Sequence, residues 1–175
     1  MVNDNSTPDK PICTKDTPPG TLPSGPLDPA YLSADIAIGR APAREEFSDL
    51  KAAGFQSIIN SRMDSEQDYS PLSAESGLMA AAHGLAYRHV PVEGRNPLEK
   101  DVRAFAAAAK ELPGPIYAYC RTGGRSAGLW ALASVGTMST EAITLKCQEA
   151  GYDVSGLKAK MDMRRNLIED GDDED

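Results

Sequence analysis

The chain has 175 residues, a length typical of one domain, and 41% of them are hydrophobic, which is enough for an ordinary buried core. Its net charge of −8 disfavours nucleic acid and anionic membrane as partners, because an acidic surface repels both. Any anion-binding site is therefore expected to be a local basic pocket on an acidic background.

The two ends of the chain differ in composition from the body. Residues 1–29 contain seven prolines and few apolar side chains, so we expect a disordered arm that cannot offset its chain entropy by burial. Residues 169–175 form an acidic run, typical of a solvated tail. The folded domain is predicted to span residues 30–168.

Strand and helix patterns alternate along this domain. Alternating apolar residues in "DIAIG" and β-branched residues in "FQSIINSR" are typical of strands, whereas "LEKDVRAFAAAAKEL" has helical spacing. The predicted strands are 35–39, 55–62, 85–92 and 115–119, and the predicted helices are 42–54, 72–84, 98–112, 126–135, 139–150 and 155–169.

This alternation predicts an α/β fold with a mainly parallel central sheet flanked by helices. Functional groups of such sheets gather at the carboxyl ends of the strands. Three loops therefore deserve inspection, and they follow Asn60, Val92 and Tyr119.

The loop after Tyr119 carries the strongest chemical signal, in the stretch "CRTGGRS". Glycines allow a tight turn whose backbone N–H groups converge on one anion, and the following helix adds its positive end. Arg125 closes this pocket with a planar fork of donors. The same groups stabilise the thiolate of Cys120, which is the reactive form of cysteine. The alternative is that Cys120 is an ordinary core residue.

The cysteines and the composition of the ends bear on the compartment. Cys13, Cys120 and Cys147 make an odd number whose spacing fits neither a zinc site nor a disulfide framework, so free thiols in a reducing compartment are expected. The first residues lack the apolar run of a secretory signal, and no segment approaches the ~18 apolar residues of a membrane span. These features predict a cytoplasmic protein with no metal site and no cofactor.

Three segments together resemble a known family: "DIAIGRAPAREEFSDLKAAGFQSIINSRMDSE", "AAAHGLAYRHVPV" and "PIYAYCRTGGRSAGLWA". They are similar to the phosphatase-like domain of beta-lactamase-hydrolase-like bacterial proteins, over roughly Leu32 to Ala150. The "CRTGGRS" loop also looks like the active-site loops of rhodanese-type sulfurtransferases and cysteine-dependent phosphatases. The resemblance implies a tyrosine-phosphatase-like fold.

Carried over to this sequence, the resemblance makes Cys120 the nucleophile and Arg125 the anion-binding arginine. The remaining residues of the loop would bind the anion with it, and Ser126 would donate a hydrogen bond to the cysteine sulfur. These binding residues are Arg121, Thr122, Gly123, Gly124 and Ser126.

Two departures from tyrosine phosphatases concern the reaction. Four residues separate Cys120 from Arg125, one fewer than in tyrosine phosphatases, so a smaller cradle is expected. Phosphate ester cleavage also needs a general acid, and the loop after Val92 offers only Glu93 and, further on, Asp101. Both departures favour sulfur over phosphorus as the atom transferred.

The loop after Asn60 offers one further pair. Arg62 and Glu66 follow the end of a predicted strand, where they would pair with each other and brace the pocket. An ordinary surface ion pair is the alternative, with a contribution of about 1 kcal/mol or less.

The sequence therefore predicts a cysteine-dependent sulfurtransferase that carries sulfane sulfur as a Cys120 persulfide and takes it from a small anionic donor. The first alternative is a phosphatase that acts on a phosphorylated substrate through phosphocysteine. The second is a non-catalytic domain that binds anions or phosphoproteins in the same cradle.

Overall fold

The computed structural model describes residues 26–66 and 69–171. Most of the predicted N-terminal arm, including Cys13, and residues 172–175 of the acidic tail lie outside the described residues. Five strands form one sheet in the order β1-β2-β5-β3-β4. They are β1 (Ala30–Tyr31), β2 (Ile36–Gly39), β3 (Ser57–Asn60), β4 (Ala86–His89) and β5 (Ile116–Tyr119).

Four of these strands are parallel neighbours, and only β1 runs antiparallel, along β2. The predicted mainly parallel α/β architecture is confirmed. The helices are α1 (Glu46–Ala52), α2 (Ser73–Ala82), α3 (Glu99–Glu111), α4 (Gly124–Ala133), α5 (Thr140–Glu149) and α6 (Lys158–Glu169), with a 3-10 turn, η1 (Ser155–Leu157), before α6.

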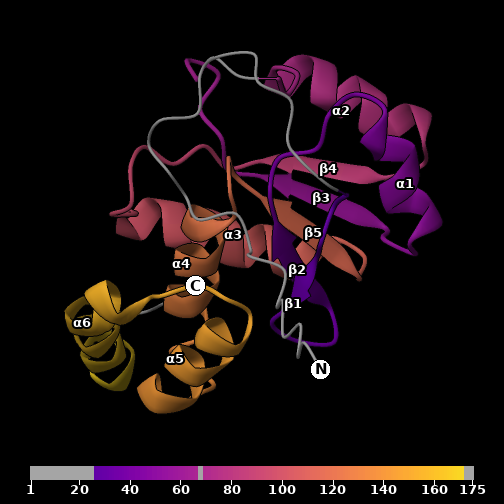
Figure 1. Ribbon diagram of the computed structural model, residues 1–175. Coiled ribbons are helices and arrows are strands. Elements are labelled where there is room, and N and C mark those ends of the chain that lie inside the picture. The colour runs from indigo at the N-terminus through magenta and orange to yellow at the C-terminus, as the bar shows by residue number, and fades with distance from the viewer. Residues whose placement is uncertain (1–25, 67–68, 172–175) are drawn as a thin grey trace, which may run out of the picture.

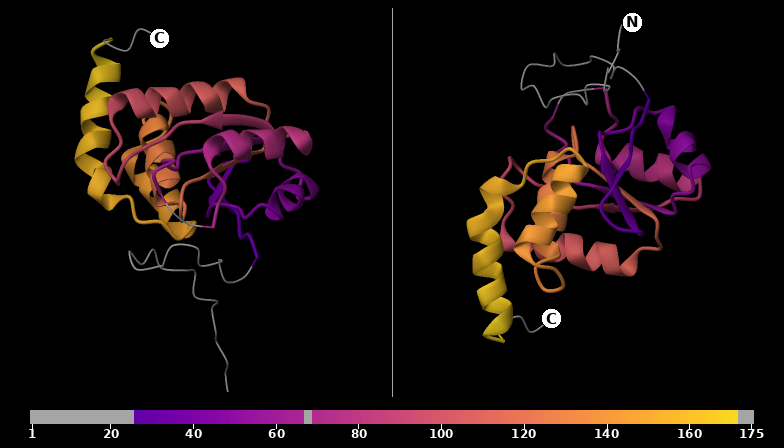
Figure 2. Two further views of the ribbon diagram at one scale, coloured as in Figure 1. Left: turned by 90° about the horizontal axis from the view of Figure 1, so that it is seen from above. Right: turned by 60° about the horizontal axis from the view of Figure 1, so that its bottom comes forward.

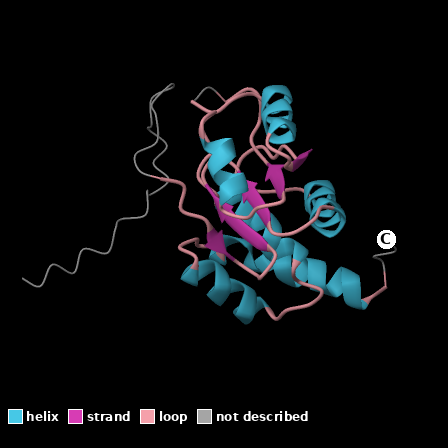
Figure 3. Ribbon diagram, turned by 90° about the vertical axis from the view of Figure 1, so that its right-hand side faces the viewer, coloured by secondary structure: helices cyan, strands magenta, loops and turns pink. Residues whose placement is uncertain are grey.

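The central strand β5 shows how the core is divided between the two faces of the sheet. Ile116 and Ala118 pack with α3, α4, α5 and α6, whereas Tyr117 and Tyr119 pack with α1 and α2. This alternation follows from the period of two in a strand. The sheet therefore lies between a two-helix layer and a four-helix layer (Figures 1 and 3).

Two helices begin where specific contacts and backbone geometry, rather than helix propensity, place them. The helix predicted from Pro42 begins at Glu46, because the preceding turn is held by the Ala41 amide on the Arg121 carbonyl and the Ala43 amide on the Glu46 carboxylate. The helix predicted from residue 126 begins at Gly124, directly after Gly123 with its positive φ of 102°. The short edge strand β1 was not predicted, since two residues carry no periodic signal.

The loops after β3, β4 and β5 emerge at the same edge of the sheet, as the parallel topology requires. The connection from α5 to α6 reaches the same region, and α6 lies beside the start of α3 (Figure 2). Within residues 26–66 and 69–171, no helix is long and apolar enough to cross a membrane.

Candidate active site

The cysteine loop follows β5 and turns directly into α4. Cys120 is only 1% exposed, and the backbone N–H of Gly123 donates to its sulfur across 3.1 Å. The left-handed φ of Gly123 aims this amide back at the sulfur, a conformation that residues with a Cβ adopt at a cost. The N-terminus of α4, at Gly124, adds its positive end beside the cysteine. The loop thus surrounds the thiol with positive backbone dipoles.

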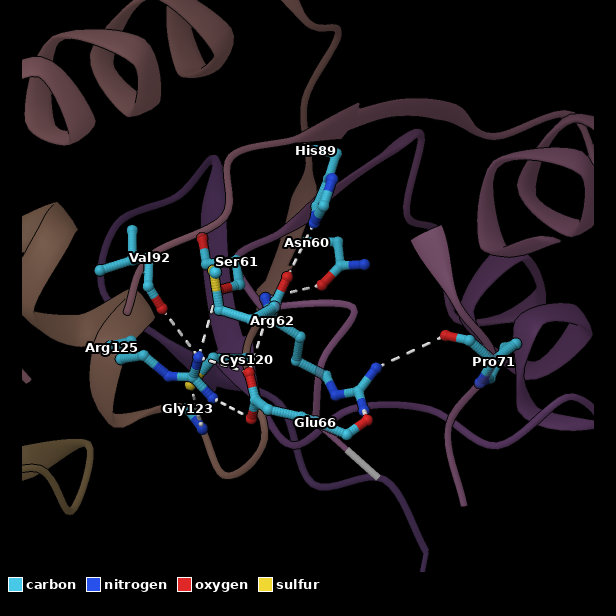
Figure 4. A network of polar contacts seen from close by, with 11 residues as sticks. Asn60, Ser61, Arg62, Glu66, Pro71, His89, Val92, Cys120, Gly123 and Arg125 are labelled. Carbon is cyan, nitrogen blue, oxygen red and sulfur yellow. Dashed lines mark hydrogen bonds and ion pairs between the residues drawn. The ribbon is translucent and has the colours of Figure 1, made fainter. Parts of the chain in front are cut away.

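Arg125 is held in the first turn of α4 by contacts on one side of its guanidinium (Figure 4). Its two terminal nitrogens donate to the two carboxylate oxygens of Glu66 across 2.7 and 2.6 Å. Nη1 also donates to the carbonyl of Val92 across 2.9 Å and approaches that of Ser61 at 3.5 Å. Of the five N–H donors of the guanidinium, Nε–H and one N–H of Nη2 are not used in these contacts, and the guanidinium also interacts with the Cys120 side chain.

The electrostatics of this pair keep both groups charged. Burial works to raise the pKa of Glu66, but hydrogen bonds from Arg125 and the Met63 amide outweigh it and hold that pKa below its usual range. Burial works to lower the pKa of Arg125, but interactions with Glu66 and with Cys120 raise it. A fixed cation therefore lies beside the Cys120 sulfur.

The predicted Arg62–Glu66 pair forms differently from the expectation. The Glu66 carboxylate binds Arg125, and Arg62 donates to the backbone carbonyl of Glu66, at 3.4 Å, and to that of Pro71, at 3.5 Å. Arg62 is 1% exposed, and its own carbonyl lies 2.7 Å from His89 Nε2. Arg62 thus supports the loop that carries Glu66, while Glu66 braces the active-site arginine.

The other predicted loop residues have distinct places. The Arg121 carbonyl accepts from the Ala41 amide, which ties the loop to the turn before α1. The Ser126 hydroxyl is fully buried and has no hydrogen-bond partner among the described residues. The expected bond from Ser126 to the cysteine sulfur is not formed, and the Gly123 amide donates to the sulfur in its place.

The two acid candidates differ in their surroundings. Asp101 lies in the first turn of α3, where its carboxylate accepts from the Leu98 amide across 2.8 Å and so caps the helix. Glu93 is exposed, and its carboxylate has no partner within the described residues. It directly follows Val92, whose carbonyl is bound by Arg125. Of the two carboxylates, that of Asp101 is engaged in a hydrogen bond and that of Glu93 is exposed.

Tyr152, in the connection between α5 and α6, contacts the cysteine loop, and the sequence did not predict this contact. Its hydroxyl donates to the Thr122 carbonyl across 3.2 Å, and a side chain at Gly123 would overlap it. Burial raises the pKa of Tyr152 to about 12, so the hydroxyl keeps its proton near neutral pH. No periodicity or motif in "GYD" points to this role, because the contact joins residues thirty positions apart.

Together these groups place the Cys120 sulfur, the Gly123 amide, the N-terminus of α4 and a braced guanidinium around one small site. Such a site is suited to a tetrahedral oxyanion, because backbone amides and guanidinium N–H groups bind oxygens.

Relatives of known sequence carry the same kind of domain. The family model for the phosphatase-like domain of beta-lactamase hydrolase-like protein matches residues 28–137. A beta-lactamase hydrolase-like protein of Agrobacterium fabrum is 37% identical over 101 residues, which cover 58% of this chain and 23% of that protein. A beta-lactamase hydrolase-like protein of Xylella fastidiosa is 33% identical over 125 residues, which cover 70% of this chain and 29% of that protein. The chain thus spans less than a third of the length of these relatives.

Solved structures with a similar fold include phosphatases and candidate phosphatases. A candidate phosphatase from Neisseria meningitidis has a TM-score of 0.69 and 25% identity, with 78% of this chain and 97% of that chain covered. Tk-PTP has a TM-score of 0.65 and 16% identity, with 81% of this chain and 96% of that chain covered. PTPMT1 in complex with PI(5)P has a TM-score of 0.63 and 15% identity, covering 80% and 96%. These likenesses confirm the tyrosine-phosphatase-like fold.

The comparisons also bear on the predicted reaction. They favour the phosphatase alternative of the sequence analysis, and they lend no support to the sulfurtransferase prediction. Because the family model covers well over half of the chain, this protein belongs to the family of phosphatase-like domains of beta-lactamase hydrolase-like proteins.

Proposed function

We propose that this domain is a cysteine-dependent phosphatase that hydrolyses phosphate monoesters through a phosphocysteine on Cys120. The observation that carries the proposal is the braced arginine: Glu66 and Val92 hold one side of the Arg125 guanidinium and leave a two-donor fork beside the sulfur. A fork of this kind binds two oxygens of a phosphoryl group at once.

In the first step, the Cys120 thiolate attacks phosphorus and the ester P–O bond breaks. The departing oxygen takes a proton from a general acid, a role we assign to Glu93 rather than to Asp101, whose carboxylate caps α3. In the second step, water attacks the phosphocysteine and gives a proton to the Glu93 carboxylate, the S–P bond breaks, and phosphate leaves with the thiolate and the protonated Glu93 restored. Loop amides and Arg125 stabilise the charge that develops on the phosphoryl oxygens.

Phosphate release from p-nitrophenyl phosphate and from an alkyl phosphate tests this proposal. The Cys120→Ser variant is expected to lose turnover of both esters, because the intermediate is covalent. Glu93→Gln should slow the alkyl ester by about 100-fold or more, the ordinary contribution of a general acid. It should slow the aryl ester much less, since nitrophenolate leaves without protonation.

Sulfur transfer is the second candidate, and the short spacing between Cys120 and Arg125 favours it. Intact mass after incubation with thiosulfate distinguishes the two chemistries, because a persulfide adds one sulfur atom to Cys120. A protein that gains sulfur on Cys120 and releases no phosphate from either ester would overturn the phosphatase proposal.

A further inference from the structure

A cleft of about 570 Å³ lies beside the cysteine loop, within the range of ~300–1,000 Å³ usual for small-molecule sites. Its base is the first turns of α4, at Gly124, Arg125 and Gly128. One wall is the loop between β4 and α3, and the other is the connection from α5 to α6. These walls contribute Arg95, Asn96 and Pro97 on one side and residues 153–157 on the other.

Both walls are tied to the body of the domain. Lys160 of α6 donates to the Pro97 carbonyl across 2.6 Å, and Arg164 of α6 pairs with Glu99 at the start of α3. On the opposite side, the Tyr152 hydroxyl fixes the α5–α6 connection to the cysteine loop at Thr122. The cleft is therefore built into the fold and does not need a ligand to form.

The chemistry of the lining is polar and contains both signs of charge. Asp153 is exposed, and hydrogen bonds from the Ser155 side chain and amide lower the pKa of its carboxyl, which stays an ionised acceptor near neutral pH. Arg95 is also exposed and has no ion pair among the described residues, so its guanidinium is an available donor. Among residues 26–66 and 69–171, no aromatic side chain lines the cleft.

The charges and donors of this lining favour some leaving groups of a phosphate ester over others. A leaving group with hydroxyls on adjacent carbons can donate to Asp153 and accept from Arg95 and Asn96, so it satisfies both the acceptor and the donors of the lining. A second phosphate could pair with Arg95 but would bring a like charge to the Asp153 carboxylate, so it satisfies only one of the two lining charges. A phosphotyrosine ring would find no aromatic partner for stacking.

We propose that this cleft binds the leaving group of the substrate, and that the leaving group is a small, uncharged polyol or sugar held by Asp153 and Arg95. The inference rests on the proposed phosphatase function for the position of the phosphate, which would lie in the cysteine loop at the end of the cleft.

Calorimetric binding to the full-length Cys120→Ser protein tests the cleft without turnover. Sorbitol phosphate should bind at least about tenfold more tightly than inorganic phosphate, phosphotyrosine or fructose bisphosphate, as expected when a charged group gains a hydrogen bond. Adding Asp153→Asn, which keeps an acceptor oxygen for the Ser155 amide, should remove this preference. Asp170→Asn, at the far end of α6, is the matched control and should keep it.

The outcomes separate the two proposals. Equal affinity for all four ligands, or a preference that survives Asp153→Asn, would overturn the assignment of the cleft. Turnover of p-nitrophenyl phosphate by the unmodified protein reports on the proposed function alone, because its leaving group carries no neighbouring hydroxyls. If the protein binds sorbitol phosphate through Asp153 but hydrolyses no ester, the assignment of the cleft is supported and the phosphatase proposal is contradicted.

Discussion

The bidentate contact between Glu66 and Arg125 offers the sharpest test of how the site is organised. In Glu66→Gln, the side chain keeps its shape but loses its charge, and one carboxylate oxygen becomes an NH₂ group. Glu66 accepts three hydrogen bonds, two from Arg125 and one from the Met63 amide across 2.7 Å, so the new donor must face another donor. The guanidinium is then free to turn away from the cysteine.

The size of the expected loss in stability and activity follows from the burial of the Arg125–Glu66 pair. The Arg125 and Glu66 side chains are 12% and 24% exposed, so solvent screens their interaction only in part. A hydrogen bond to a charged group contributes about 1.5–3 kcal/mol, and we expect the variant to lose about 2 kcal/mol of unfolding free energy. If a similar amount is lost from binding of the transition state, kcat/KM falls about 30-fold.

Glu46→Gln is a matched control within the same chain. Glu46 also makes a bidentate pair, with Arg40 across 2.9 and 2.7 Å, and accepts a third bond from the Ala43 amide. Its exposure is similar, at 17% for the glutamate and 12% for the arginine. Both variants should lose comparable stability in urea unfolding, but only Glu66→Gln should also lose about 30-fold in p-nitrophenyl phosphate turnover. Equal activity in the two variants would refute the bracing role of Glu66.

The pH dependence of stability supplies a second readout for the same substitution. The folded-state pKa of Glu66 is depressed from its ordinary 4.5, so its contribution is complete above that value and is lost as the pH falls through the folded pKa. The difference in unfolding free energy between the unmodified protein and Glu66→Gln should therefore be constant near neutral pH and shrink below about pH 4.5. A difference that persists in strong acid would contradict an ionic origin.

Two further predictions concern the cysteine loop. Gly123→Ala should lower the melting temperature by roughly 2–8 °C, since an alanine at φ 102° is strained by about 1–2 kcal/mol and its Cβ would overlap Tyr152. Gly124→Ala, with open space around it, should lower the melting temperature far less, and equal losses would argue against the strain. Mild iodoacetamide below pH 7 should label Cys120 before Cys147, because burial raises the pKa of Cys147 to about 11. Peptide mapping measures the two labelling rates. Equal labelling rates would count against an activated thiolate at Cys120.

Much of the fold could be predicted from local patterns. The alternation in "PIYAY" and the helical spacing of "LEKDVRAFAAAAKEL" place β5 and α3 close to their observed bounds, since each pattern is set by neighbouring residues. The ends of elements were predicted less well. Pro42 favours a first helical turn, but the contact of Ala41 with Arg121, eighty residues away, keeps that segment irregular.

The sequence by itself determined which residues make up the cysteine loop, because Cys120, two glycines and Arg125 are near neighbours between a strand pattern and a helix pattern. The tertiary structure decided which carboxylate meets the arginine. Glu66 lies 59 positions from Arg125, and the pairing of β3 with β5 brings it there in place of the expected contact with Arg62. The same folding placed Tyr152 against Thr122 and turned Asp101 into a helix cap. Such contacts depend on strand order and on the packing of distant segments, which no window of neighbouring residues contains.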